Sequence, residues 1–413
     1  MENASTPLKE TTRKGAKWLF ITGIILIATN LRAPLTSVGA LIAAIRDDLD
    51  ISNTLAGSIT TLPLLAFALL SPFAPKIAKK IGMEWTIFFA LVVLIAGIVL
   101  RSSFGTAALF GGTVIIGIAI AMGNVLLPGF IKMNFPLKIG IMTGMYAIFM
   151  NIFGALGSGL SVPISSIQGW GWQGSLVIWA ALTFLSLLVW IPQLRKPENP
   201  VKTTSTPVQG KTSLLRSSLA WHITLFMGLQ SLMFYTLITW LPAILQSQGF
   251  SSNAAGWMLF LMQFSLIPIT FIVPVIAERM ESQKTLSLIT AIFFIIGVSL
   301  LMAGIKPLLF VAVILIGIAG GSAFSLSMMF FTLRTSDGQQ AAEMSGMAQS
   351  LGYLLAAVGP VLLGALHDWT GGWTMSLVLL LVVSAVMLLS GYEAGKKRVI
   401  STVHEPVSDE HAS

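Results

Sequence analysis

The chain of 413 residues is 55% hydrophobic and only 10% charged, a balance that excludes a soluble globular protein and predicts membrane-spanning segments. Its net charge of +8 does not indicate nucleic-acid binding, because the basic residues lie in short segments between long apolar runs. The sequence has no Cys, which excludes disulfides and thiolate metal sites, and we expect neither a metal nor a cofactor.

Twelve apolar segments are long enough to cross the hydrocarbon core of a bilayer, which takes a helix of ~20 residues. Charged or Gly- and Pro-rich breaks separate them, and the first is too long for the apolar core of a signal peptide. We therefore predict an all-α membrane protein with twelve transmembrane helices. The predicted spans are residues 18–45, 51–75, 84–103, 106–133, 138–165, 173–193, 218–246, 253–277, 284–304, 307–333, 340–366 and 373–393.

The first span carries Arg32 about halfway along its length, too deep for the side chain to reach the membrane surface. A charge at that depth costs roughly 2.5–3.5 kcal/mol on insertion scales, so Arg32 is expected to face the protein interior and a partner there. All 16 acidic residues fall in loops, tails or span ends, so none of them is suited to be that partner. We predict that Arg32, with Thr36 one turn further along the helix, binds an anionic substrate. The alternative, in which carbonyl groups freed near Pro34 and water satisfy the guanidinium, stays open.

An Asn lies four residues before a Pro in both the first and the fourth spans, as Asn30 and Pro34 and as Asn124 and Pro128. Because proline has no N–H group, the Asn carbonyl loses its helical partner and the helix can kink. We predict substrate binding for the two Asn residues and a gating role for the two Pro residues. A kink that serves only packing is the alternative.

The other polar side chains at membrane depth are also candidates for substrate binding, because each needs a hydrogen-bond partner there. Bonds between helices are the commoner use of such groups, and the sequence does not separate the two uses. The candidates are Tyr146 and Asn151 in the fifth span, Gln230 and Tyr235 in the seventh, Gln263 in the eighth and Tyr353 in the eleventh.

The distribution of basic residues predicts how the chain lies in the membrane, since cytoplasmic loops carry an excess of Lys and Arg. Twenty of the 24 basic residues lie on the side of the N-terminus, whereas Arg46, Arg101 and Lys306 lie on the other side. We predict that both termini are cytoplasmic. The predicted organisation is a tail of residues 1–17, six-helix bundles at 18–193 and 218–393, a Pro-containing cytoplasmic linker at 194–217 and a second tail at 394–413.

Short motifs recur at a spacing of about 200 residues and in the same order. The segment Ile116-Gly-Ile-Ala119 matches Ile316-Gly-Ile-Ala319, and Met142-Thr-Gly-Met145 matches Met344-Ser-Gly-Met347. This order indicates two parallel six-helix repeats, whose binding site is expected near the membrane midplane where the halves meet.

These features resemble the major facilitator superfamily over essentially the whole chain. Lys79-Lys80-Ile81-Gly82 is a degenerate form of that family's loop motif, and Glu278-Arg279 is a better-preserved acid–base pair at the corresponding place in the second half. The resemblance therefore implies a gating role for Glu278 and Arg279. Asn30-Leu31-Arg32-Ala33-Pro34 is more specifically similar to the signature of the cyanate/nitroimidazole porter family.

We therefore predict a secondary transporter of the bacterial plasma membrane that moves a small anionic or polar solute, such as cyanate, by alternating access. An efflux carrier for nitroaromatic or other drug-like compounds is the alternative. An intramembrane enzyme would need a catalytic dyad or metal cluster at membrane depth, and the sequence shows no such arrangement. We expect a monomer whose partners are a small-molecule substrate and membrane lipids, and no nucleic acid.

Overall fold

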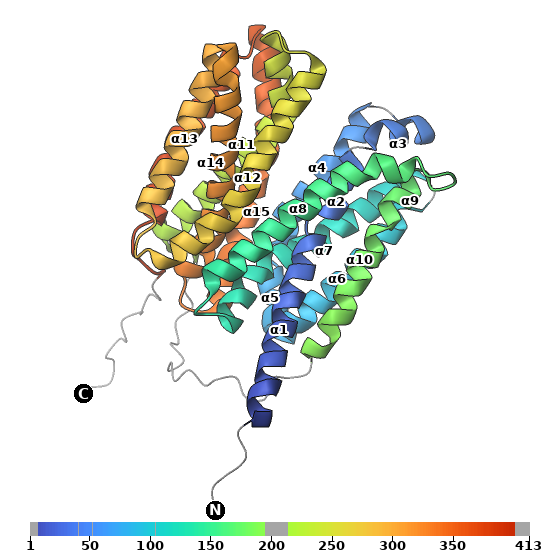
Figure 1. The fold of residues 1–413 in the computed structure, drawn as a ribbon, viewed down its shortest axis with the longest axis vertical. Coiled ribbons are helices and arrows are strands. Elements are labelled where there is room, and N and C mark those ends of the chain that lie inside the picture. The colour runs from blue at the N-terminus through green and yellow to red at the C-terminus, as the bar shows by residue number, and fades with distance from the viewer. Residues whose placement is uncertain (1–6, 40, 52, 104, 195–213, 401–413) are drawn as a thin grey trace, which may run out of the picture.

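The structure, a computed structural model, describes residues 7–39, 41–51, 53–103, 105–194 and 214–400. Its described part is helical and contains no strand. The helices form two bundles that lie side by side, and the start of the first helix and the end of the last helix lie at the same end of the molecule (Figure 1). Most of the predicted linker, residues 195–213, lies outside the described residues.

The N-terminal bundle contains the helices α1 to α10, and the C-terminal bundle contains α11 to α16. The helices of the first bundle are α1 (Pro7–Asn30), α2 (Ala33–Gly39), α3 (Ile42–Leu49), α4 (Asn53–Leu70), α5 (Ala74–Ile81), α6 (Met83–Arg101), α7 (Thr106–Asn134), α8 (Ile139–Ser165), α9 (Gly171–Val177) and α10 (Trp179–Trp190). Those of the second are α11 (Ser218–Ser247), α12 (Ser252–Arg279), α13 (Lys284–Ala303), α14 (Lys306–Leu333), α15 (Gly338–Thr370) and α16 (Thr374–Ala394). Short 3₁₀ turns follow α10 and precede α11.

Eleven helices or joined helix segments of the described chain are long and apolar enough to cross a membrane. The pair α4–α5, bent by 56°, makes a twelfth if it is one span. The predicted all-α membrane architecture is thereby confirmed.

The prediction of one continuous helix over residues 18–45 is wrong. Helix α1 ends at Asn30, α2 begins at Ala33, and α3 is separate from both. The break follows from Pro34, which has no N–H group to offer the carbonyl of Asn30. At the break the amide of Leu31 bonds to the nearer carbonyl of Ala28. Arg32 therefore lies in a break within the first span.

The two halves repeat the same close helix packing at positions 200 residues apart. A Cβ placed on Gly97 of α6 would lie 3.0 Å from the side chain of Ile116 in α7, and one on Gly297 of α13 would lie 2.7 Å from that of Ile316 in α14. Small residues allow such close approach of helices in membranes. The motif containing Ile116 and Ile316 therefore marks one equivalent helix pair in each repeat.

The two bundles meet at one end of the molecule and diverge toward the other (Figure 1). We call the end with the start of α1 and the end of α16 the inner end, and the opposite one the outer end. At the inner end, a Cβ on Gly144 of α8 would lie 2.9 Å from the carbonyl oxygen of Phe271 in α12. Further out, the same face of α8 continues through Ala155, Ser158 and Val162, which are exposed. The halves are thus in contact at the inner end and apart at the outer end.

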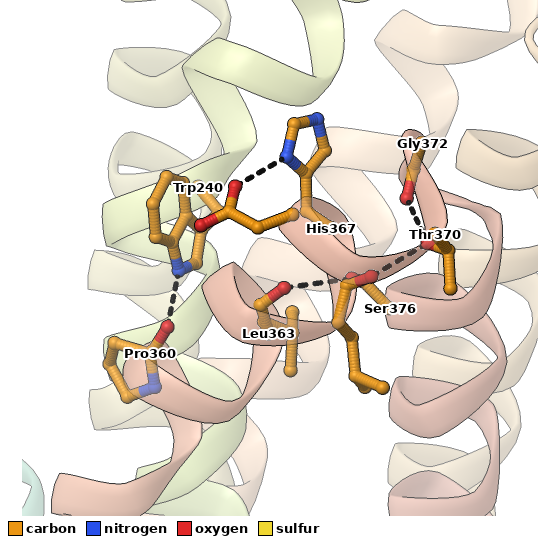
Figure 2. A network of polar contacts seen from close by, with 9 residues as sticks. Trp240, Pro360, Leu363, His367, Thr370, Gly372 and Ser376 are labelled. Carbon is orange, nitrogen blue, oxygen red and sulfur yellow. Dashed lines mark hydrogen bonds and ion pairs between the residues drawn. The ribbon is translucent and has the colours of Figure 1, made fainter.

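Each half is held together within itself at the outer end. In the C-terminal half, Trp240 of α11 donates its indole N–H to the carbonyl of Pro360 in α15 over 2.7 Å, and Ser376 of α16 donates to the carbonyl of Leu363 over 3.0 Å (Figure 2). In the N-terminal half, Ser161 of α8 donates to the carbonyl of Ser37 in α2 over 2.8 Å. These bonds tie helices to neighbours of the same bundle.

Candidate functional site

A small cavity lies between the two halves at the break of the first span. Its volume is about 20 Å³, room for about one water molecule. Both halves contribute to its wall. The lining residues are Arg32 at the break, Asn151 of α8, Gln230, Ser231, Phe234 and Tyr235 of α11, Leu266 of α12, Gly320 and Phe324 of α14, and Tyr353 of α15.

Arg32 supplies the positive charge of this cavity. Its guanidinium donates to the side-chain oxygen of Asn151, and its central carbon lies 5.2 Å from the ring centre of Phe234 and 6.0 Å from that of Phe324. Such ring faces attract a cation. Phe234 and Phe324 belong to the C-terminal half, so Arg32 reaches from one half toward the other.

Two neighbours in α8 set the position of the Arg32 side chain. Asn151 donates its own amide N–H to the carbonyl of Ala147 over 2.8 Å, which leaves its oxygen facing the guanidinium. Gly154 lies against the stem of Arg32, and a Cβ there would come within 2.8 Å of the Cδ atom. A glycine at this place therefore lets the side chain lie close to α8.

None of the ion pairs among the described residues includes Arg32. Its contacts there are a neutral amide and aromatic rings. A charge with neutral partners in a low-dielectric interior interacts strongly with any opposite charge that arrives. The cavity is therefore electrostatically suited to an anion and unsuited to a cation.

Three phenol groups lie within electrostatic range of Arg32. Tyr235 and Tyr353 line the cavity, with their ring centres 6.4 Å apart. Tyr146 is buried and is not among the lining residues, and its hydroxyl contacts the sulfur of Met328 at 3.6 Å. The hydroxyls of Tyr235 and Tyr353 can donate to a bound oxygen atom.

Asn30, predicted to bind substrate, points away from the cavity. Its side-chain oxygen accepts a bond from Thr183 over 2.6 Å, and its amide donates to Ser186 over 2.7 Å, both in α10. The break after Asn30 does not bring it toward Arg32, and α10 saturates its bonding groups instead. Asn30 therefore joins helices, which corrects its predicted placement.

Thr36 and Gln263 also lie apart from the cavity. The hydroxyl of Thr36 donates to the carbonyl of Gly154 over 2.7 Å, so it fastens α2 to α8. Gln263 lies on an exposed face of α12 and is absent from the cavity wall. Its position one residue beyond the buried Met262 turns it outward on a helix of 3.6 residues per turn.

Asn124 takes part in the contact between the halves through its backbone. Its carbonyl, which has no helical partner because of Pro128, accepts a bond of 3.0 Å from the side chain of Gln349 in α15. Pro34 in turn lies directly beyond the break of the first span. Of the two predicted gating prolines, Pro128 therefore frees a carbonyl at the contact between the halves, and Pro34 lies beside the break of the first span.

The predicted pair Glu278 and Arg279 ends helix α12 at the inner end. The carboxylate of Glu278 lies beside Gly140, in the first turn of α8, so it faces the positive end of a helix of the other half. None of the ion pairs within the described chain includes Glu278 or Arg279.

Arg101, which the sequence places at an external span end, is buried with only 1% of its surface exposed. One of its terminal nitrogens donates to the carbonyl of Pro34 over 2.6 Å, while its other two nitrogens have no hydrogen-bond partner among the described residues. It fastens α6 to the segment that follows Arg32. Its position at the end of an apolar run gave no signal of this burial.

The aromatic residues Phe234 and Phe324 were also missed by sequence reasoning, because Phe is abundant throughout the spans. The spacing of Gln230, Ser231, Phe234 and Tyr235 carries a usable signal, since these residues form two neighbouring pairs at i and i+4 on α11. These four residues form one face of α11, and that face lines the cavity.

A sequence profile of the Major Facilitator Superfamily matches residues 18–360. The chain belongs to this superfamily. It is 48% identical over 384 residues to the uncharacterized transporter YycB of Bacillus subtilis, covering 93% of this chain and 94% of that protein. It is 40% identical over 383 residues to the 2-nitroimidazole transporter of Escherichia coli, covering 92% and 96% of the two proteins.

The cyanate transport protein CynX of Escherichia coli is 24% identical over 355 residues, covering 85% of this chain and 91% of that protein. Among solved structures, the proton:xylose symporter XylE has the same fold, with a TM-score of 0.72 at 14% identity over 93% of this chain and 98% of that one. The family and the relatives that are 48% and 40% identical show that the protein is a transporter of small solutes and not an enzyme. It is a multi-pass protein of the plasma membrane.

Proposed function

We propose that the protein is a secondary transporter that moves a small anionic solute across the plasma membrane by alternating access. The observation that carries this proposal is the placement of Arg32. Its charge reaches a cavity between the two halves, where its partners are a neutral amide and two aromatic rings, and it forms no ion pair with any of the described residues. An anion that enters supplies the counter-charge.

The side chains around Arg32 give such an anion further hydrogen bonds. A guanidinium offers several N–H donors in one plane, which suits a linear or planar anion. The hydroxyls of Tyr235, Tyr353 and Ser231 and the amide of Gln230 line the same cavity and can donate to its other atoms. Cyanate, a small linear anion, matches this set of donors, and a relative of this chain is named a cyanate transport protein. It is larger than one water molecule, so the side chains around the cavity of about 20 Å³ would have to move apart to admit it.

The charge distribution supplies the proposed direction of access. We place the inner end in the cytoplasm because it carries most of the basic residues. Both termini and the linker 194–217 then lie in the cytoplasm, with the bundles 18–193 and 218–393 in the membrane. In this orientation the open outer end faces the outside, and the solute reaches Arg32 from there.

A second candidate substrate is a nitroaromatic compound, exported from the cell. The aromatic wall favours it, because Phe234, Tyr235, Phe324 and Tyr353 all line the cavity and flat rings stack on one another. A relative that matches nearly this whole chain is named a 2-nitroimidazole transporter. A ring-sized solute needs more room than the cavity of about 20 Å³, so these side chains would have to move apart.

Transport by purified protein in liposomes tests both candidates. Radiolabelled cyanate and 2-nitroimidazole are assayed with the wild-type protein and with Arg32→Gln, Arg32→Lys and Arg46→Gln, the last an arginine of the outer end. We expect Arg32→Gln to reduce cyanate transport by about a hundredfold or more, a loss that matches a charged bond of ~3 kcal/mol. Arg32→Lys should restore part of it, and Arg46→Gln should match the wild type. Undiminished cyanate transport by Arg32→Gln would refute the anion proposal, whereas transport of 2-nitroimidazole alone would favour the second candidate.

A further inference from the structure

Two side chains of α15 reach across the inner end to backbone carbonyls of the other half. Gln349 donates its amide N–H to the carbonyl of Asn124 in α7 over 3.0 Å. Ser350, its neighbour in sequence, donates its hydroxyl to the carbonyl of Ala68 in α4. One turn of α15 is therefore bonded to two helices of the N-terminal half.

Both of these carbonyls lack their ordinary helical partner for the same reason. In an α-helix the carbonyl of residue i accepts the N–H of residue i+4. The residue at that place is Pro128 for Asn124 and Pro72 for Ala68, and proline has no N–H to give. The two prolines thus leave free acceptors on the face that meets α15.

A third donor acts in the opposite direction, from the N-terminal half to the C-terminal half. Lys132, near the end of α7, places its ammonium group against the carbonyls of Thr332 and Thr335 and 3.2 Å from the hydroxyl of Thr335. These carbonyls belong to the last turn of α14 and the residues after it, where a helix leaves acceptors unpaired and a cation is favoured.

Glycines bring the two backbones close enough for these short bonds. A Cβ on Gly346 of α15 would lie 2.8 Å from the carbonyl oxygen of Ser71, and one on Gly144 of α8 would lie 2.9 Å from that of Phe271. Gly144 and Gly346 occupy the same place in the repeated Met-Thr-Gly-Met and Met-Ser-Gly-Met motifs. The internal repeat therefore supplies two equivalent close contacts, one on each side of the interface.

All five ion pairs within the described residues lie inside one half or the other, so none of them joins the halves. We infer that Lys132, Gln349 and Ser350 are gating residues that hold the inner end shut by donating to backbone carbonyls that lack a helical N–H partner, an arrangement that we call the carbonyl latch. This inference rests on the proposed alternating access. To open the inner end, all three donors must exchange their carbonyl partners for water.

The carbonyl latch is tested by measuring the distance between the halves in protein without substrate. The chain has no native Cys, so spin labels can be placed on single introduced cysteines without other changes. Leu137→Cys with Val399→Cys reports on the inner end, and Ile167→Cys with Ile305→Cys reports on the outer end. All four positions are exposed in the structure.

We expect Gln349→Leu to raise the ratio of inward-open to outward-open molecules about tenfold, because the carbonyl of Asn124 stays buried without a donor when the inner end is closed. Lys132→Met should raise it between tenfold and a hundredfold, since it removes a charged donor with several acceptors. In both variants the inner pair should gain a longer distance while the outer pair gains a shorter one. Lys76→Met, at an exposed lysine of the same end, is the matched control and should keep the wild-type distances.

Unchanged distances in both Gln349→Leu and Lys132→Met would overturn the inference, as would an equal shift in Lys76→Met. The two variants lie on different helices, so if one fails to fold the other still decides the matter. Because the distances are measured without any solute, a failure of the latch leaves the transport proposal standing. Conversely, if Arg32→Gln loses transport but keeps the wild-type spin-label distances, the substrate site is impaired while the carbonyl latch is intact.

Discussion

Hydrogen bonds from a side chain to a backbone carbonyl occur at both the inner and the outer end of the molecule, but they join different parts of it. At the outer end Trp240 donates to the carbonyl of Pro360, and donor and acceptor belong to one bundle. At the inner end Gln349 donates to the carbonyl of Asn124, and the bond joins the two bundles. Backbone carbonyls accept in both places, so the chemistry of the bond does not decide which end is closed. What decides it is whether the donor and acceptor lie in the same half.

Helix α8 shows the same contrast along a single element. Near its inner end Gly144 lies tightly against α12. Further out, a Cβ on Gly159 would meet no atom within 4 Å beyond its own helix. One rigid helix thus carries a closed contact and an open surface, as expected if the halves move as bodies about a site between those places.

Locking the inner end should have the largest effect. A Cβ on Gly338 would lie 3.0 Å from the Cβ of Met133 in the other half, closer than the ~3.5–4.5 Å of a disulfide. It would also lie 2.7 Å from the carbonyl oxygen of Gly129, so the two backbones must move slightly apart to admit the bond. In a chain without native Cys, Met133→Cys with Gly338→Cys should form a cross-link on oxidation and reduce transport by on the order of a hundredfold, because alternating access needs these ends to part. A reducing agent should restore the rate. Full transport by the fully cross-linked protein would contradict closure by rigid halves.

A smaller change at the same end should shift the balance of conformations without blocking it. In Gly144→Ala the new methyl group would press on the carbonyl of Phe271, so we expect the inward-open fraction to rise about fivefold, the result of ~1 kcal/mol of overpacking. Gly159→Ala in the same helix gains the same helix propensity but touches nothing, and it should leave the fraction unchanged. Spin-label distances at the two ends measure both variants, and an identical response of the two would argue against a close contact at Gly144.

At the outer end a lost bond should affect stability rather than the balance of conformations. Trp240→Phe removes the donor to Pro360, and we expect it to lower the free energy of unfolding by about 1 kcal/mol. Thermal unfolding in detergent measures this loss. The spin-label distances should remain those of the wild type, because this bond lies within the C-terminal half. A shift toward closure of the outer end in Trp240→Phe would show that the two ends are not separable.

Salt should have the smallest effect on the closed inner end. None of the ion pairs among the described residues joins the halves, and the ammonium of Lys132, which does cross the inner contact, bonds to neutral carbonyls, so salt has little to screen there. We expect the same inner-end distances at about 0.05 M and about 1 M salt, measured on the wild-type protein. A clear increase of the inward-open fraction at high salt would point to ion pairs as the force that closes this end.

The sequence predicted the cavity only in part. It singled out Arg32, Asn151, Gln230, Tyr235 and Tyr353, which the structure brings together around one cavity. It could not separate Gln230 from Gln263, since both are amides in the middle of an apolar helix. The rotation of each helix against its neighbours turns one into the cavity and the other onto an exposed face.

The arginines Arg32 and Arg101 also show how far the sequence alone can predict burial. Arg32 stands alone within a span and is recognisable there, whereas Arg101 stands at the end of a span, where the sequence predicts an external charge. In the structure both are associated with the break of the first span, Arg32 within it and Arg101 bonded to Pro34 just beyond it. Burial of Arg101 depends on the approach of its side chain from α6 to the carbonyl of Pro34 in α2, which local sequence does not encode.

The sequence by itself determined the apolar helices, the duplicated plan and the presence of one charge deep in the first span. Those features are local, because a bilayer requires every helix to be long, apolar and internally bonded. The tertiary structure alone decided which polar groups share the cavity and which end of the molecule is closed. Both depend on contacts between helices far apart in the chain, where a free carbonyl in one half meets a donor from the other.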